Sequence, residues 1–112
     1  LRAVEVNAMV VIYKKKNFKI YDAGTNYIVH NTRLNFKEHH THIKNFHTCK
    51  FLIDMSIHES IPEKHLSDYL LVSLIRLSNN KVYINKLNHI LDDNKERHKQ
   101  NRKRYQQWKK QN

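Results

Sequence analysis

The stretch that decides the fold spans residues 9–30, MVVIYKKKNFKIYDAGTNYIVH. It contains three short segments rich in β-branched and aromatic residues, at 9–13, 18–21 and 27–30. Polar residues separate these segments, and the only glycine of the chain, Gly24, lies where a turn favours a positive φ. The pattern predicts a three-stranded antiparallel sheet. Because a sheet of this size is not stable alone, we expect other elements to cover one of its faces.

A first helix is predicted over residues 48–59, with either Asn45 or Thr48 as its N-cap and Pro62 as its stop. Its apolar residues recur at the spacing of one helical face: Cys49, Leu52, Ile53 and Ile57. The exposed face of this helix is expected to carry Asp54 and Glu59 as solvated charges.

A second helix is predicted over residues 68–77, with Ser67 as its N-cap and Asp68 placed to interact with the helix dipole. It is apolar on almost all sides, so we expect it to be the most buried helix. A third helix is predicted to begin near Lys81 and to keep an apolar stripe as far as Leu91. The element order βββααα predicts a single α+β domain over residues 9–93, with the helices packed on one face of the sheet.

Composition excludes several classes of protein. The chain has 112 residues, and 39% of them are hydrophobic, which supports one domain and argues against full disorder. No apolar run is long enough to span a membrane. The single cysteine excludes an intramolecular disulfide framework and favours a reducing compartment, so we expect a cytoplasmic protein. One glycine and one proline leave no Gly-rich phosphate loop, which excludes most nucleotide-dependent enzymes, and no cofactor is predicted.

The net charge of +11 is concentrated at the two ends of the chain. Residues 1–37 carry 7 basic and 2 acidic side chains, and residues 94–112 carry 8 basic and 1 acidic side chain. The segment between them, with 6 basic and 7 acidic side chains, is nearly neutral. A packed neutral centre with basic ends is therefore expected.

Residues 94–112 are predicted to form a basic tail or a helical extension of the third helix, because helix propensity is high and no apolar stripe is present. The candidate binding residues are Lys95, Arg97, Lys99, Arg102, Lys103, Arg104, Tyr105, Trp108, Lys109 and Lys110. Lys and Arg release counterions from nucleic-acid phosphates, and Tyr and Trp stack on unpaired bases or anchor a protein partner. An acidic protein surface is an equally good target, and a solvated tail without a partner is the alternative.

A second basic group is predicted near the amino-terminal strands, where it would extend the positive surface if it lies on the same side as the tail. Its members are Lys14, Lys15, Lys16, Lys19, Arg33 and Lys37. Tyr13, Tyr21 or Tyr27 would then form an aromatic platform of the kind that single-strand binders use. The alternative is that these tyrosines complete the core.

Histidines gather in residues 38–47, which read as a loop before the first helix. In an extended segment, His40 and His42 point their rings to one side, and imidazole is a common zinc ligand. No metal site is predicted, because no pair of cysteines or set of carboxylates accompanies them; His40, His42 and His47 are the only candidate ligands. Cys49 lies close to His47 in sequence, but two residues apart on a helix do not face each other, so Cys49 is assigned to the core.

Three segments resemble small, mostly uncharacterised proteins encoded by phages and mobile islands of low-GC Gram-positive bacteria. They are residues 27–32 (YIVHNT), 40–45 (HTHIKN) and the pair 66–70 (LSDYL) with 73–78 (SLIRLS). The resemblance implies a context, the cytoplasm of a bacterial host, and it identifies no catalytic residue. Small proteins of such elements often bind and block a host machine, as anti-CRISPR proteins obstruct Cas effectors. A basic chain would do so without mimicking a DNA duplex.

The leading hypothesis is a non-enzymatic protein that binds nucleic acid or a host nucleoprotein such as a Cas effector, as an anti-CRISPR-type inhibitor of host defence. The first alternative is a DNA- or RNA-binding transcriptional regulator, in which residues 68–77 and 81–91 imitate a helix-turn-helix. The second alternative is a His-dependent metal-binding enzyme. No membrane partner is expected.

Overall fold

The computed structural model describes residues 9–62 and 66–111, so residues 1–8 and the last residue of the predicted tail, Asn112, lie outside the described residues. Four strands precede the helices: β1 (Val10–Lys15), β2 (Phe18–Asp22), β3 (Tyr27–Asn31) and β4 (His40–Ile43). They form one antiparallel sheet in the order β1-β2-β3-β4. The helices are α2 (Phe46–His58), α3 (Asp68–Arg76) and α4 (Lys81–Gln111). The α+β class and the order of sheet before helices are confirmed, but the predicted count of three strands is wrong.

The fourth strand, β4, runs through the residues that were expected to form a histidine loop. Thr41 pairs with Val29 of β3, and both Thr41 and Ile43 are buried on the face that the helices cover. The hydroxyl groups of Thr41 and Ser73 of α3 lie 2.7 Å apart and share a hydrogen bond. Strand β4 thus pairs with β3 and also bonds with α3, and its short polar sequence does not mark it as a strand.

The two predicted turns between the first strands are present. The β1–β2 turn is tighter than predicted, because β1 extends through Lys15 and only Lys16 and Asn17 form the turn. Lys16 has a φ of 56°. Gly24 has a φ of 91° in the β2–β3 turn, as expected, and its N–H donates to the carboxylate of Asp22 at 2.9 Å.

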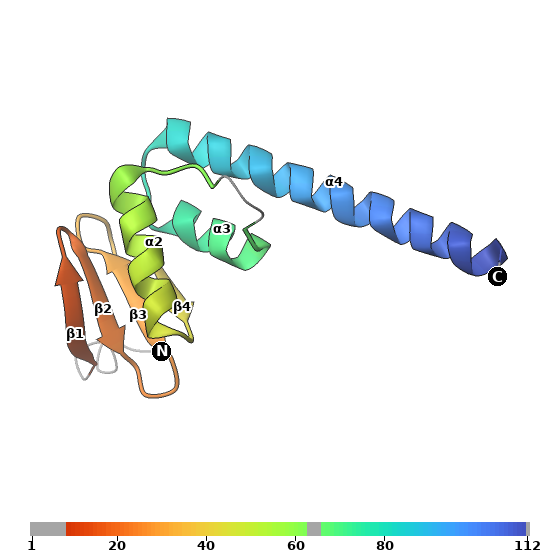
Figure 1. Ribbon diagram of the computed structural model, residues 1–112. Coiled ribbons are helices and arrows are strands. Elements are labelled where there is room, and N and C mark those ends of the chain that lie inside the picture. Colours follow the sequence, from red (N-terminus) through yellow and green to blue (C-terminus); the bar gives the residue numbers. More distant parts are fainter. Residues whose placement is uncertain (1–8, 63–65, 112) are drawn as a thin grey trace.

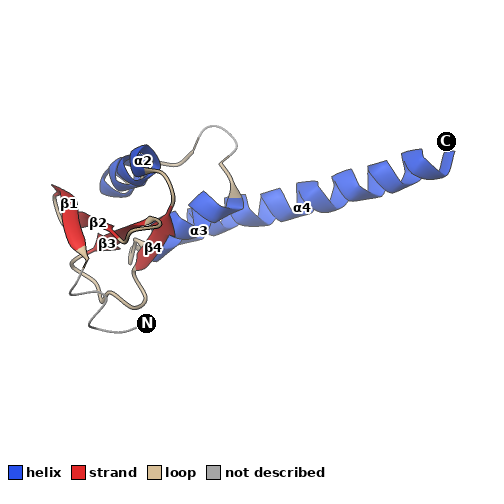
Figure 2. Cartoon of the chain, turned by 90° about the horizontal axis from the view of Figure 1, so that it is seen from below, coloured by secondary structure: helices blue, strands red, loops and turns tan. Residues whose placement is uncertain are grey.

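The core lies between the sheet and the helices (Figures 1 and 2). Helices α2 and α3 contact the sheet, whereas α4 packs on α3 rather than on the strands. The fully buried side chains include Ile20 and Val29 of the sheet, Leu52 and Ile53 of α2, and Leu87 of α4. The predicted apolar stripes of the first and third helices are thus the faces that the core buries.

Helix α3 differs from its prediction as a helix buried on all sides. Leu71 and Leu74 are fully buried, but Tyr69 is 56% exposed and Val72 is 40% exposed. The polar residue Ser73 is buried in their place, because its hydroxyl bonds with Thr41. Helices α2 and α4 and strand β4 all contact α3, whereas Tyr69 and Val72 are exposed to solvent.

The helix ends follow local chemistry. Asn45 caps α2 by accepting from the N–H of Thr48, and Ser67 caps α3 by accepting from the N–H of Leu70. Helix α2 stops before Pro62: Glu59 adopts the left-handed conformation with a φ of 48°, and the N–H of Ser60 bonds with the carbonyl of Met55 at 3.0 Å.

Candidate nucleic-acid interface on α4

Helix α4 is one continuous helix of 31 residues, and Asn94 is its last buried side chain among the described residues. Asn94 is 1% exposed, and its Nδ2 donates to the carboxylate of Asp68 and to the carbonyl of Leu66. Every side chain from 95 to 111 is exposed. We call residues 95–111 the distal half of α4; it projects beyond the other elements in Figure 1. The predicted helical extension is present, and Asn94 belongs to the packed part.

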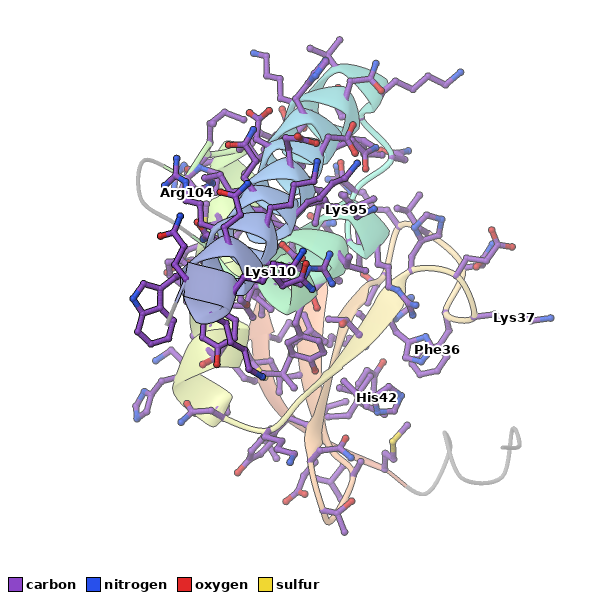
Figure 3. The ribbon with its side chains drawn as sticks, turned by 90° about the vertical axis from the view of Figure 1, so that its right-hand side faces the viewer. Phe36, Lys37, His42, Lys95, Arg104 and Lys110 are labelled. Atoms are coloured by element: carbon purple, nitrogen blue, oxygen red, sulfur yellow. The ribbon has the colours of Figure 1, made fainter. Side chains whose placement is uncertain are left out.

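The basic side chains of the distal half are unevenly distributed around the helix. An α-helix turns by about 100° per residue, so six of the eight basic side chains fall within about one third of its circumference. We call this set the lysine face: Lys95, Lys99, Arg102, Lys103, Lys109 and Lys110. The other two, Arg97 and Arg104, lie on the opposite side, and Figure 3 shows Lys95 and Arg104 pointing away from each other across α4. Arg97 also donates to the amide oxygen of Asn94.

Two aromatic side chains of the distal half stack on each other. The ring centroids of Tyr105 and Trp108 are 6.0 Å apart, with an angle of 29° between the ring planes. Each residue is 59% exposed. They continue the line of the buried residues Leu87, Leu91 and Asn94 along α4, so the face that packs in the first half of the helix is open in the second half.

The second basic group does not join the distal half. Figure 1 shows the β1–β2 turn, which carries Lys16, and the carboxyl end of α4 at opposite ends of the molecule. Lys15 forms an ion pair with Asp54 of α2 at 2.6 Å, so its charge is partly balanced. Lys14 is exposed on the edge strand β1. The two groups are therefore two separate positive regions.

The predicted tyrosine platform on the open sheet face is not formed. Tyr13 and Tyr27 pack against the core, where their rings contact Phe46 at centroid distances of 6.0 and 5.7 Å. Tyr21 lies on the other face of the sheet, against the ring of Phe36. Two of the three tyrosines thus complete the core, because the alternation along each strand sends them to the face that the helices cover.

The histidines of β4 lie on the sheet face away from the helices, under the loop that carries Phe36 (Figure 3). His40 and His42 do point to one side, with ring centroids 5.1 Å apart, and the ring of Phe36 stacks on His40 at 4.3 Å. His47 is on α2 instead. Among residues 9–62 and 66–111, no three or more His, Cys, Asp or Glu side chains are arranged to hold a metal ion.

The same face buries His30, which is 8% exposed. Its Nε2 donates to the carbonyl of Leu34 at 2.9 Å, and its Nδ1 is buried without a hydrogen-bond partner in the described structure. Burial lowers the pKa of His30, and the nearby charges of His40 and Lys19 lower it further. The hydrogen bond from Nε2 therefore ties the carbonyl of Leu34, in the loop, to His30 of β3.

Cys49 has the environment of a core residue. It is fully buried, and burial raises the pKa of its thiol to about 11. A thiol in this environment is not ionised near neutral pH, so Cys49 lacks the property that makes a cysteine nucleophilic.

A polar pocket of about 430 Å³ lies where the β1–β2 turn meets the carboxyl ends of α2 and α3. Lys16, Arg33 and Glu59 contribute charged groups to its lining. Helix carboxyl ends carry partial negative charge, which offsets the two cations. This balance does not favour an anionic ligand, so the pocket is a weaker candidate site than the distal half of α4.

Comparison of the chain with protein-family models, with curated proteins and with solved structures returned no match. The described helices include none with the length and apolar character needed to cross a membrane. The interpretation of function therefore rests on the residues themselves.

Proposed function

We propose that this protein is a non-enzymatic binding protein that acts on nucleic acid or a nucleoprotein through the distal half of α4. The observation that supports this proposal is a helical segment, exposed at every residue, that carries eight basic side chains and an exposed aromatic pair. This composition is not that of a packed helix, because no described side chain of the segment is buried.

Charge repulsion within the distal half supports an anionic partner. Lys95, Lys99 and Lys103 succeed one another at four-residue intervals, where like charges face each other along a helix and destabilise it. A polyanion removes this repulsion when it binds, and the release of its condensed counterions adds a favourable entropy.

The more specific proposal is an inhibitor of host defence encoded by a phage or mobile element, with a Cas effector as an example of its target. It rests on the resemblance of residues 27–32, 40–45 and 66–78 to small proteins of such elements. A target that holds RNA and DNA presents the phosphates that the distal half would contact, and no duplex mimicry is required of a chain with a net charge of +11.

The transcriptional-regulator alternative receives less support from the geometry. Helices α3 and α4 pack side by side and run in opposite directions in Figure 1, as in an αα-hairpin. A helix-turn-helix instead sets its second helix across the first, so that this helix enters the major groove. The metalloenzyme alternative receives no support from the geometry, because His47 is on α2 whereas His40 and His42 are on β4.

The test compares two variants that lose equal charge. The first replaces Lys95, Lys99 and Lys103 with Gln, and the second replaces Lys44, Lys81 and Lys86, which are exposed outside both basic groups, with Gln. We expect only the first to lose affinity for nucleic acid, with a log–log salt slope flattened by about 2–3. Equal effects of the two variants would show that net charge, and not the distal half, drives binding.

A pull-down from host lysate, with and without nuclease, then separates the two kinds of target. Capture of a protein complex that survives nuclease treatment favours the inhibitor. Saturable binding of free duplex without such a complex favours the regulator. If the purified protein contains no metal and its function is unchanged by His40→Ala and His42→Ala, the metalloenzyme alternative is contradicted.

A further inference from the structure

The arrangement of side chains around the distal half of α4 distinguishes among nucleic acids. Tyr105 and Trp108 occupy a face that is bordered by Arg104 on one side and by Arg102 and Lys109 of the lysine face on the other. We propose that the ligand of this site is unpaired nucleic acid, with bases stacked on the aromatic pair and phosphates on the flanking cations. This inference rests on the proposed function and names its ligand class.

The stacking faces of the aromatic pair favour an unpaired strand. Base–aromatic stacking needs a base with a free face, and a single strand offers one at every nucleotide. In a duplex each base face is covered by its neighbours, and separating one step costs a few kcal/mol. The rings of Tyr105 and Trp108 are already ordered against each other, which lowers the entropy lost when a base is added.

The size of a duplex groove leads to the same conclusion. The major groove is about 12 Å wide, and an α-helix with its side chains is about 10–12 Å across. A helix therefore fills the groove with its ordinary side chains, which leaves little room for two adjacent large rings such as Tyr105 and Trp108. The side chains that read base edges are chiefly Arg, Asn and Gln, and an indole or phenol ring does not match those edges.

The experiment uses the full chain and the fluorescence of Trp108, which is the only tryptophan in the sequence. Three ligands of equal length are titrated at one salt concentration: oligothymidylate, an abasic oligonucleotide with the same phosphates, and a mixed-sequence duplex. We expect oligothymidylate to quench Trp108 and to bind most tightly. The abasic strand should bind through charge alone, without quenching.

Variants assign the effect to the aromatic pair, with affinity measured by anisotropy of labelled ligand. Trp108→Ala should weaken oligothymidylate binding by about 5- to 150-fold, the range expected for the loss of one stacked base. It should leave abasic-strand binding and the salt slope unchanged, because stacking releases no counterions. Trp108→Phe keeps an aromatic ring for stacking, so it should restore part of the loss.

The possible failures are distinct. If the duplex binds as tightly as oligothymidylate, or if Trp108→Ala weakens abasic-strand binding equally, the inference is overturned and the proposed nucleic-acid function stands. If none of the three ligands binds while an acidic protein does, both are overturned.

Discussion

Asn94 of α4 donates a hydrogen bond from Nδ2 to the Oδ1 atom of Asp68 in the first turn of α3, across 3.0 Å. The same Nδ2 lies 3.3 Å from the carbonyl oxygen of Leu66, and Arg97 donates to the Asn94 amide oxygen. A side chain that is only 1% exposed depends on such partners, since water cannot replace them. This bond marks the point where the packed half of α4 gives way to the distal half.

The first prediction concerns this buried amide. Asn94→Ala should lower the free energy of unfolding by about 1–3 kcal/mol, because the Leu66 carbonyl and the Asp68 carboxylate lose a donor. Urea denaturation measures the change. Asn101→Ala is the matched control, since Asn101 lies two turns further along the same face and is exposed; a similar loss in that variant would show that helix propensity, and not the buried bond, is responsible.

The second prediction concerns the independence of the distal half. Deleting residues 95–112 should leave the melting temperature nearly unchanged, because no apolar side chain of the segment is buried. Deleting residues 92–112 also removes Asn94 and should lower the melting temperature by about 4 °C or more. Thermal unfolding followed by circular dichroism distinguishes the two. An unfolded product from the shorter deletion would place Tyr105 and Trp108 in the core.

The third prediction concerns the two sides of α3. Leu71→Ala or Leu74→Ala should cost about 2–5 kcal/mol, because both side chains are fully buried and a cavity remains. Val72→Ala on the same helix should cost about 0.5 kcal/mol, since Val72 is 40% exposed. Equal destabilisation by the three substitutions, measured in urea, would contradict the orientation of α3.

The fourth prediction concerns acid. The unfolded chain protonates His30 near its ordinary pKa of about 6.5, whereas burial lowers the pKa of His30 in the folded protein. The unfolded state therefore binds the proton first, and stability falls as the pH drops below about 6.5 towards the folded-state pKa. His30→Gln keeps a donor for the Leu34 carbonyl and should flatten the fall in melting temperature between pH 7 and 5. The same change at the exposed His89 should leave that slope intact.

Several features of the fold are encoded locally, and sequence reasoning found them. Ser67 is the predicted cap of α3, and Asn45 is one of the two candidates for α2 beside Thr48; each accepts from the N–H group three residues ahead. The stripe of Cys49, Leu52 and Ile53 follows from helical periodicity alone. Local bonds and local periodicity do not require knowledge of the rest of the chain.

Strand β4 could not be found in this way. Thr41 is buried where its hydroxyl group bonds with that of Ser73, 32 residues later. Tyr69 of α3 likewise donates to the carbonyl of His42, at the strand's outer edge. A polar residue whose hydrogen-bond partner is distant in sequence shows the same local pattern as a polar residue in a loop. Periodicity therefore cannot distinguish the two.

The sequence by itself determined the α+β class, the amphipathic helices and the basic composition of residues 94–112, because each depends on residue type and spacing. Only the tertiary structure decided that β4 joins the sheet, that Tyr13 and Tyr27 face the core, and that packing of α4 ends at Asn94. These outcomes depend on which elements pack against each other, because a side chain is buried only where a second element covers it. The exposed state of Tyr105 and Trp108 has the same origin: α4 continues beyond the elements that cover its first half.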